Sequence, residues 1–102
     1  MTAPAFDEII HNPVRLRACA MLAVLDFAAF PVLRDELGVS DSVLSKHLAT
    51  LESAGYVKLD KATSAGRLRT SVALTSAGRK AYAAHVEALR RIVAGEATSS
   101  QG

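Results

Sequence analysis

Residues 37–59, LGVSDSVLSKHLATLESAGYVKL, decide the fold of this chain, because a helix end, a turn and a new helix follow one another within them. Gly38 suits the left-handed residue that ends a helix. Ser40 or Asp41 can cap the helix that starts directly afterwards. Apolar residues then recur at helical spacing: Leu44, Leu48 and Leu51. Two helices joined by so short a turn predict a helix-turn-helix over about residues 30–54.

Beyond Gly55 the hydrophobic pattern changes from a helical period to a period of two. The apolar residues of this pattern are Val57, Leu59, Val72 and Leu74. They predict the two strands of a hairpin over about residues 56–74. The polar stretch 61–69 separates the two runs, and Gly66 gives it the freedom to turn. We therefore expect this stretch to project as a flexible wing.

A further helix is predicted upstream of this block. Asn12 and Pro13 are typical of the cap and the first residue of a helix, which we expect over residues 14–25. Its apolar face would be formed by Leu16, Ala20, Ala23 and Val24, joined by Phe27 just beyond it. After a short break, Pro31 suits the first turn of the next helix, the one that Gly38 ends.

Downstream, Thr75 or Ser76 can cap a last helix over about residues 76–95. Residues 96–102 are expected to form a flexible tail. The order helix, helix, turn, helix, hairpin, helix is that of a winged helix-turn-helix, mainly α with a small β-hairpin. A chain of 102 residues fits one such domain, over residues 1–95, with no room for a separate catalytic or sensory domain.

The composition is that of an ordinary globular chain, with 50% hydrophobic and 22% charged residues. No apolar run approaches the roughly 18 residues of a membrane span, and the N-terminus lacks the pattern of a secretory signal. The single cysteine, Cys19, allows no intramolecular disulfide and no cysteine-based zinc cage, and we expect it to be a small buried residue. These features predict a cytoplasmic protein without a membrane partner.

The charges are unevenly spread along the chain. Residues 1–39 carry two more acidic than basic side chains, whereas residues 40–74 and 75–102 each carry two more basic than acidic ones. Such asymmetry favours a polyanionic partner, although a solvated helix or hairpin face produces the same imbalance.

The outer face of the predicted second helix of the helix-turn-helix carries the functional hypothesis. At about 100° per residue, this face holds small, polar and basic side chains: Ser42, Ser45, Lys46, Ala49 and Ser53. Hydroxyl and ammonium groups meet phosphates and base edges in the major groove of DNA, and an alanine methyl can touch thymine. A plain solvated helix face is the alternative. His47 lies nearer the buried boundary, where a packed histidine and a DNA contact both remain open.

The predicted wing carries three basic residues near its tip, Lys61, Arg67 and Arg69. They could follow the DNA backbone or place an arginine in the narrow minor groove, because this topology brings the wing beside the recognition helix. A solvated hairpin would have the same composition. Arg15 and Arg17, at the start of the first helix, either pair with acids or touch phosphate, and the sequence does not decide between these roles.

The last helix predicts a homodimer. It would be about 30 Å long, more than so small a core needs. An apolar stripe on this helix and apolar residues near the N-terminus would together leave surplus apolar surface in a monomer: Tyr82, Val86, Leu89 and Val93, with Phe6, Ile9 and Ile10. Pairing about a twofold axis would bury this surface and set two recognition helices about one DNA turn, roughly 34 Å, apart. The alternative is that the stripe packs on its own domain.

No enzyme is predicted, because the sequence shows no nucleophile with a base, no clustered carboxylates and no phosphate-binding glycine loop. No metal or other cofactor is expected either, since His11, His47 and His85 lack metal-ligand spacing and are expected to be structural. The alternative to DNA binding is a winged-helix module for protein–protein contact, with its basic face solvated or facing an acidic partner.

Three segments resemble the MarR/ArsR-type winged-helix regulators, and most closely the short MarR-like DNA-binding proteins. They are HNPVRLRACAMLA at 11–23, the block at 37–59 and LTSAGRKAY at 74–82. The resemblance implies a prokaryotic transcription regulator that dimerises through its terminal helices, reads a pseudo-palindromic operator and represses transcription until an effector weakens binding. The operator, the effector and the sign of regulation do not follow from these residues.

The resemblance also implies particular DNA contacts. Carried over by position, they fall near Ser42, Ser45, Lys46 and Thr50, and in the wing at Arg67 and Arg69. One departure is informative: metal sensors of the ArsR type have a cysteine pair where this chain has the acidic and apolar residues 35–39, which argues against metal sensing through thiolates.

Overall fold

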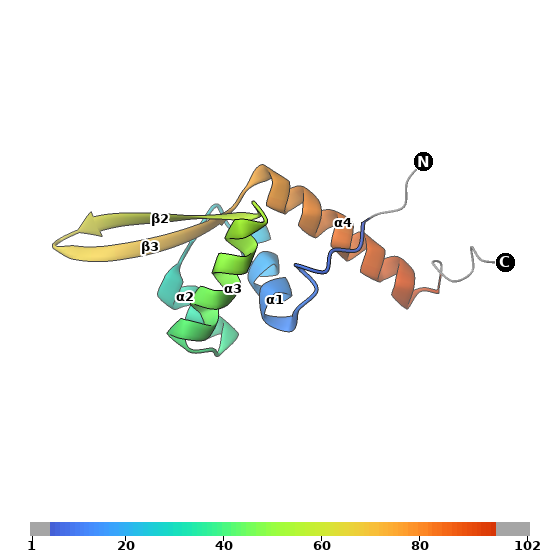
Figure 1. Ribbon diagram of the computed structural model, residues 1–102, viewed down its shortest axis with the longest axis horizontal. Helices are drawn as coiled ribbons and strands as arrows, with labels where there is room; N and C mark the ends of the chain where they lie inside the picture. Colours follow the sequence, from blue (N-terminus) through green and yellow to red (C-terminus); the bar gives the residue numbers. More distant parts are fainter. Residues whose placement is uncertain (1–4, 96–102) are drawn as a thin grey trace.

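The computed structural model describes residues 5–95, which form four helices and one small sheet (Figure 1). In chain order the elements are α1 (Pro13–Ala23), β1 (Ala28–Ala29), α2 (Phe30–Leu37), α3 (Asp41–Ser53), β2 (Val57–Ser64), β3 (Arg67–Leu74) and α4 (Ser76–Val93). This order confirms the predicted winged helix-turn-helix, mainly α with a β-hairpin. The expected flexible tail at 96–102 lies outside the described residues.

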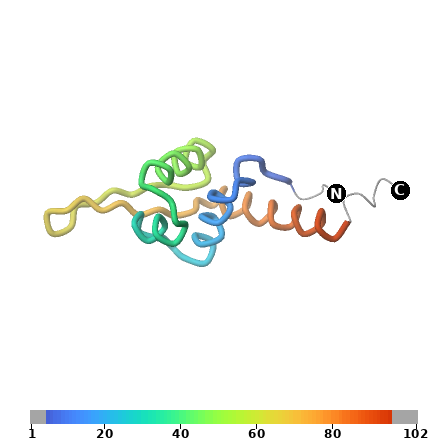
Figure 2. The backbone as a smooth tube through the Cα atoms, turned by 90° about the horizontal axis from the view of Figure 1, so that it is seen from below, coloured from blue at the N-terminus to red at the C-terminus, as the bar shows by residue number. Residues whose placement is uncertain are grey.

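The molecule is elongated, with extents of 62 × 25 × 21 Å. The hairpin of β2 and β3 projects at one end and α4 runs out toward the other, while α1, α2 and α3 lie between them (Figure 1). Seen from below, α3 and the N-terminal segment lie on one side of the long axis, and the end of α1 lies on the other (Figure 2).

Three side-chain caps start the longer helices as expected. The oxygens of Asn12, Ser40 and Thr75 accept hydrogen bonds from backbone N–H groups in the first turns of α1, α3 and α4. Gly38 ends α2 in the left-handed conformation, with φ of 67°. The predicted caps and the predicted helix end at Gly38 are therefore confirmed. Each of them depends only on residues a few positions apart in the chain.

The predicted apolar face of α1 is wrong at its C-terminal end, whereas Leu16 and Ala23 pack against the core as predicted. The helix ends at Ala23 rather than at residue 25, and its fully buried residues are Ala18, Cys19 and Leu22. Val24 and Phe27 are 83% and 64% exposed. The N–H of Val24 bonds to the carbonyl of Met21 in a final tight turn, so the 100° repeat does not continue into residues 24–27. Leu16, Ala20 and Ala23 are half-buried.

The sheet has three antiparallel strands in the order β1-β3-β2. The sequence did not predict β1, because two residues are too few to show an alternating pattern; Ala28 pairs with Val72. Pairing between β2 and β3 continues to Ser64 and Arg67.

The wing is therefore a paired hairpin nearly to its tip, not the flexible loop expected at 61–69. Its two-residue turn has positive φ at Ala65 (53°) and Gly66 (75°). Tight hairpin turns need this backbone because its twist matches that of the strands. The basic residues of the wing are thus fixed to strand positions.

The core lies between the helices and the base of the sheet, where the predicted leucines Leu44, Leu48 and Leu51 are buried. Gly78 in the first turn of α4 lies directly against the backbone of Tyr56, where a Cβ would overlap the Tyr56 carbonyl. The N–H of Thr75 donates to the same carbonyl, at 2.9 Å. Over residues 5–95, no helix is long and apolar enough to cross a membrane.

Candidate nucleic-acid interface

The exposed side of α3 carries the side chains that the sequence assigned to DNA. Ser42, Ser45, Lys46 and Ala49 are all exposed, and we call these four residues the reading face. Thr50 is half-buried, and its hydroxyl donates to the backbone carbonyl of Lys46 at 3.1 Å. From residue 42 to residue 50 the helix has no acidic side chain. The acids of α3 lie outside this stretch, at Asp41 in the first turn and at exposed Glu52 in the last turn.

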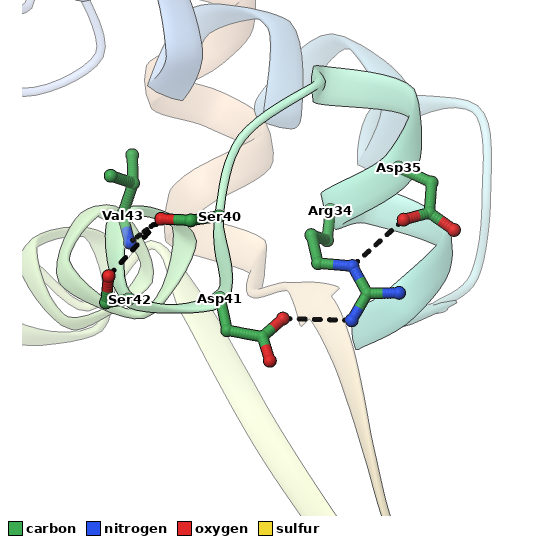
Figure 3. Close-up of polar contacts among 6 residues, drawn as sticks. All are labelled: Arg34, Asp35, Ser40, Asp41, Ser42 and Val43. Atoms are coloured by element: carbon green, nitrogen blue, oxygen red, sulfur yellow. Dashed lines mark hydrogen bonds and ion pairs between the residues drawn. The ribbon is translucent and has the colours of Figure 1, made fainter.

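The first turn of α3 does carry an acid, but α2 neutralises it (Figure 3). Arg34 of α2 donates through Nη1 to Asp41 and through Nε to Asp35, both at 2.9 Å. These two bonds, first to Asp35 and then to Asp41, raise the pKa of Arg34 further above its usual value. The ion pairs also fix the turn between the helices, next to the Ser40 cap of α3.

The register of the wing separates its three basic residues. Arg67 and Arg69 are two positions apart on β3, so their side chains lie on one face of the hairpin. Lys61 pairs with Thr70 and therefore lies on the opposite face, the one that continues from buried Val72. All three basic residues are exposed. The three residues therefore do not form one cluster. The positive charge of the wing is concentrated on the face that carries Arg67 and Arg69.

The two arginines of α1 whose roles the sequence left open are both held by backbone carbonyls. Arg17 donates to the carbonyls of Glu36 and Leu37 at the end of α2. Arg15 donates through Nε to the carbonyl of Ile9 at 2.5 Å and through Nη1 to Nδ1 of His47 at 3.0 Å. Neither forms an ion pair with an acid among the described residues.

The residues expected at a dimer interface divide into exposed and buried groups. The exposed ones are Phe6, Ile9, Val86 and Val93, and the half-buried ones are Tyr82 and Leu89. Ile10 is fully buried in the core of its own domain and is therefore unavailable to a partner, which corrects that expectation. A shallow hollow of about 500 Å³ runs along α4 between Val86 and Ala94. Ile92, which is also exposed on α4 but does not line this hollow, was missed from the sequence.

Two histidines that are far apart in sequence meet where the N-terminal segment crosses α4. The N–H of Asp7 donates to Nδ1 of buried His85 at 2.9 Å, and Nε2 of His85 lies 3.2 Å from Nδ1 of His11. Tyr56 donates its hydroxyl to the Asp7 carboxylate. We call Asp7, His11, Tyr56 and His85 the anchor. Residues 5–95 contain no group of three or more histidine, cysteine, aspartate and glutamate side chains that could hold a metal.

The tautomers of the anchor follow from its geometry. Because Nδ1 of His85 accepts a hydrogen bond, neutral His85 carries its proton on Nε2 and donates it to His11. Burial, and then the neighbouring His11, lower the pKa of His85. Sequence spacing gave no sign of this pairing, since the partners are 74 to 78 residues apart.

Cys19 lies in the core, as expected for a small apolar residue. Burial, and secondarily the negative charge of Asp7, raise the pKa of its thiol to about 11. The thiolate that reacts with oxidants is therefore scarce near neutral pH.

Taken together, the fold and the reading face define a winged helix-turn-helix with an exposed recognition helix beside a basic hairpin. Residues 14–93 match the family model described as winged helix DNA-binding domain. The chain therefore belongs to the family of winged helix DNA-binding domains. The resemblance to MarR-type regulators is confirmed by the structures that are similar to it.

The similar proteins cover most of the chain. An uncharacterized protein of Methanocaldococcus jannaschii is 33% identical over 75 residues, which are 74% of this chain and 82% of the relative. A transcriptional regulator homologue from Pyrococcus horikoshii OT3 has a TM-score of 0.82 and 30% identity over 87% of this chain and 88% of its own. NadR in complex with 4-hydroxyphenylacetate has a TM-score of 0.65 and 26% identity, covering 88% of this chain and 67% of that one. The family is described by DNA binding, and the similar structure from Pyrococcus horikoshii OT3 as a homologue of a transcriptional regulator.

Proposed function

We propose that the protein is a sequence-specific double-stranded DNA-binding regulator of transcription, acting in the cytoplasm as a homodimeric repressor on a pseudo-palindromic operator. The observation that carries this proposal is the reading face, an exposed row of hydroxyl, ammonium and methyl groups on a helix that carries no acid from residue 42 to residue 50. Its membership in a family of DNA-binding domains supports the same conclusion.

In this proposal α3 enters the major groove, which is wide enough to admit a helix. Ser42 and Ser45 would donate to or accept from base edges and phosphates, and the Ala49 methyl would meet the methyl group of thymine. Lys46 would anchor a phosphate, since about half or more of the hydrogen bonds between proteins and DNA go to the backbone. Arg67 and Arg69, on one face of the wing, would bind the adjacent backbone or the narrow minor groove.

The homodimer is proposed from the unpartnered face of α4. The helix is about 27 Å long at 1.5 Å per residue. Val86, Ile92 and Val93 of α4 are exposed, and the C-terminal end of this helix lies away from the wing (Figure 1). Phe6, whose ring contacts His85 of α4, and Ile9 are exposed as well. An identical surface on a second copy would cover these groups about a twofold axis, which matches the symmetry of a palindromic DNA site.

A small-molecule effector is proposed as the signal that releases DNA. Support comes from NadR, a similar structure that was solved in complex with 4-hydroxyphenylacetate. Effectors act by binding one conformation of a regulator better than another, so the effector would favour a conformation that does not bind DNA.

The test is a fluorescence-anisotropy titration of the full chain against fragments of its own genome at two salt concentrations. We expect one or more fragments to bind tightly, to weaken steeply as salt rises, and to lose affinity in the Lys46→Ala/Arg67→Ala variant. Lys80→Ala, which removes an exposed cation of α4, is the matched control and should bind as the wild type does. If no fragment binds better than random DNA, sequence-specific regulation is wrong and a protein-interaction module becomes the better description.

A further inference from the structure

A small hollow lies on the flank of α3 that faces away from the wing. Figure 2 shows the N-terminal segment beside α3 on this flank, and the wing leaves on the other. The hollow has a volume of about 380 Å³, and its lining comes from the start of α1 and from one side of α3: Arg15, Val43, Lys46, His47 and Thr50. Its lining includes Lys46 of the reading face, so the hollow adjoins the reading face.

The hollow carries two cations that no acid compensates. Neither Arg15 nor Lys46 forms an ion pair within the described part of the chain, and the lining contains no acidic residue. By contrast, Arg34, Arg90 and Arg91 are all paired with carboxylates. Uncompensated cations that share a concave surface with a hydroxyl residue make a site for an oxyanion.

His47 fixes the direction of the Arg15 guanidinium. Because arginine has no acceptor, Nη1 of Arg15 must donate to Nδ1 of His47, and His47 must be unprotonated at that nitrogen. Burial, followed by the charges of Arg15 and Lys46, lowers the pKa of His47, which favours this neutral form. The guanidinium has five N–H groups, of which two are used by Ile9 and His47, so three remain to donate to a ligand.

We propose that Arg15 and Lys46 together hold one backbone phosphate of the DNA, and that His47 is the positioning residue that aims the Arg15 guanidinium at it. The inference rests on the proposed DNA-binding function and extends the interface from α3 and the wing to α1. DNA would then be held on both flanks of α3, by the arginine pair of the wing on one side and by this phosphate site on the other. A phosphate contact adds affinity without sequence preference.

The test measures the salt dependence of binding to a random-sequence duplex of about 30 base pairs, using the full chain. Each phosphate contact contributes about 0.9 to the slope of log affinity against log salt concentration. We expect Arg15→Gln to lower this slope by at most about 0.9, because Lys46 still faces the same phosphate, and to weaken binding to different duplexes equally. Arg15→Lys keeps the charge and should keep most of the slope, which separates a lost phosphate contact from a damaged fold.

The matched control is Arg79→Gln, because Arg79 is likewise held by two hydrogen bonds and no ion pair. It donates to the backbone carbonyls of Ala23 and Leu25, at and just beyond the end of α1 that lies away from α3 (Figure 2). The salt-dependence slope of Arg79→Gln should equal that of the wild type. An equal drop for Arg79→Gln would show a general charge effect and overturn the phosphate site. An unchanged slope for Arg15→Gln would also overturn the phosphate site. If the Arg67→Ala/Arg69→Ala variant lowers the slope in the same experiment, the proposed DNA binding through the wing is retained. A wild-type chain without salt-dependent binding would refute both proposals.

The positioning role of His47 has its own readout. Oδ1 of asparagine occupies nearly the place of Nδ1 of histidine, so His47→Asn should still accept from Arg15 and retain the slope, whereas His47→Leu should lower it. If His47 acts through Arg15, adding His47→Leu to Arg15→Gln should cause no further loss of slope. A further loss in the double variant, or a failure of His47→Asn to rescue, would contradict the positioning role.

Discussion

The polar side chains of the reading face and those of the anchor differ in how far they are hydrogen-bonded within the protein. On the reading face only Ser42 has a side-chain hydrogen bond, to the Ser40 hydroxyl, and all four side chains are exposed. In the anchor, polar groups from the N-terminal segment, from the turn between α3 and β2, and from α4 are bonded to one another across 49 to 78 residues of sequence. No buried side-chain nitrogen or oxygen in residues 5–95 lacks a partner.

This difference separates what the fold requires from what a DNA partner would require. An exposed side chain without partners can be replaced at little cost to the folded state, because nothing buried loses a contact. A buried and fully bonded group leaves an unsatisfied partner when it is replaced. We therefore expect variants near the anchor to change stability, and variants of the reading face to change binding alone.

The largest effect on stability is expected at Gly78, where α4 packs against the backbone of Tyr56 between α3 and β2. In Gly78→Ala the new Cβ would overlap the carbonyl of Tyr56, and both partners are backbone, so α4 must shift. Displacing α4 would also strain the bond from Thr75 to the same carbonyl. We expect the free energy of unfolding to fall by about 3 kcal/mol or more, measured by urea denaturation. Ala83→Ser, on the exposed side of α4, should change it by less than about 0.5 kcal/mol.

A smaller loss in the free energy of unfolding is expected for His85→Phe, which keeps an aromatic ring at this position. The variant removes the acceptor for the Asp7 N–H and the donor to His11, so we expect a loss of about 1–3 kcal/mol at pH 7.5. Stability equal to the wild type at this pH would show that the anchor does not hold the N-terminal segment.

The same variant should also change the pH dependence of stability. The pKa of His85 is lowered in the folded state, so the unfolded chain binds more protons once the pH falls toward about 6.5. Wild-type stability should therefore decline as the pH is lowered through about 6.5 and below, until the folded-state pKa is passed. Around His85 lie Asp7 and Glu8, which favour its charged form, and His11, which opposes it. His85→Phe lacks this contribution, so denaturation curves at several pH values should show the gap between the two proteins narrowing as the pH falls.

The contrast between the two regions also explains which features could be predicted from the sequence. The caps at Asn12 and Ser40, the Gly38 turn and the buried leucines of α3 are set by neighbours within one or two helical turns, and the sequence predicts them all. The reading face follows from the same helical repeat, and its four side chains are exposed as the repeat implies. Whether they bind DNA stays a prediction.

Features that depend on distant segments could not be predicted in this way. The pairing of His11 with His85, the contact of Arg15 with His47 and the close approach at Gly78 each join segments that a periodic pattern treats separately. The paired tip of the wing was missed for a different reason. A polar strand whose two faces are both exposed has no hydrophobic alternation, so its composition resembles that of a loop.

The smallest effect on stability is expected at the surface that the DNA hypothesis needs most. Lys46→Ala/Arg67→Ala removes two exposed side chains that have no hydrogen bond or ion pair of their own in the described residues, and alanine favours the helix at position 46. We expect the free energy of unfolding to stay within about 0.5 kcal/mol of the wild type in urea denaturation, while DNA affinity is lost. A loss of more than 1 kcal/mol would mean that the reading face also supports the fold. In that case, reduced DNA binding by this variant would no longer identify a contact, and the separation between the two regions would fail.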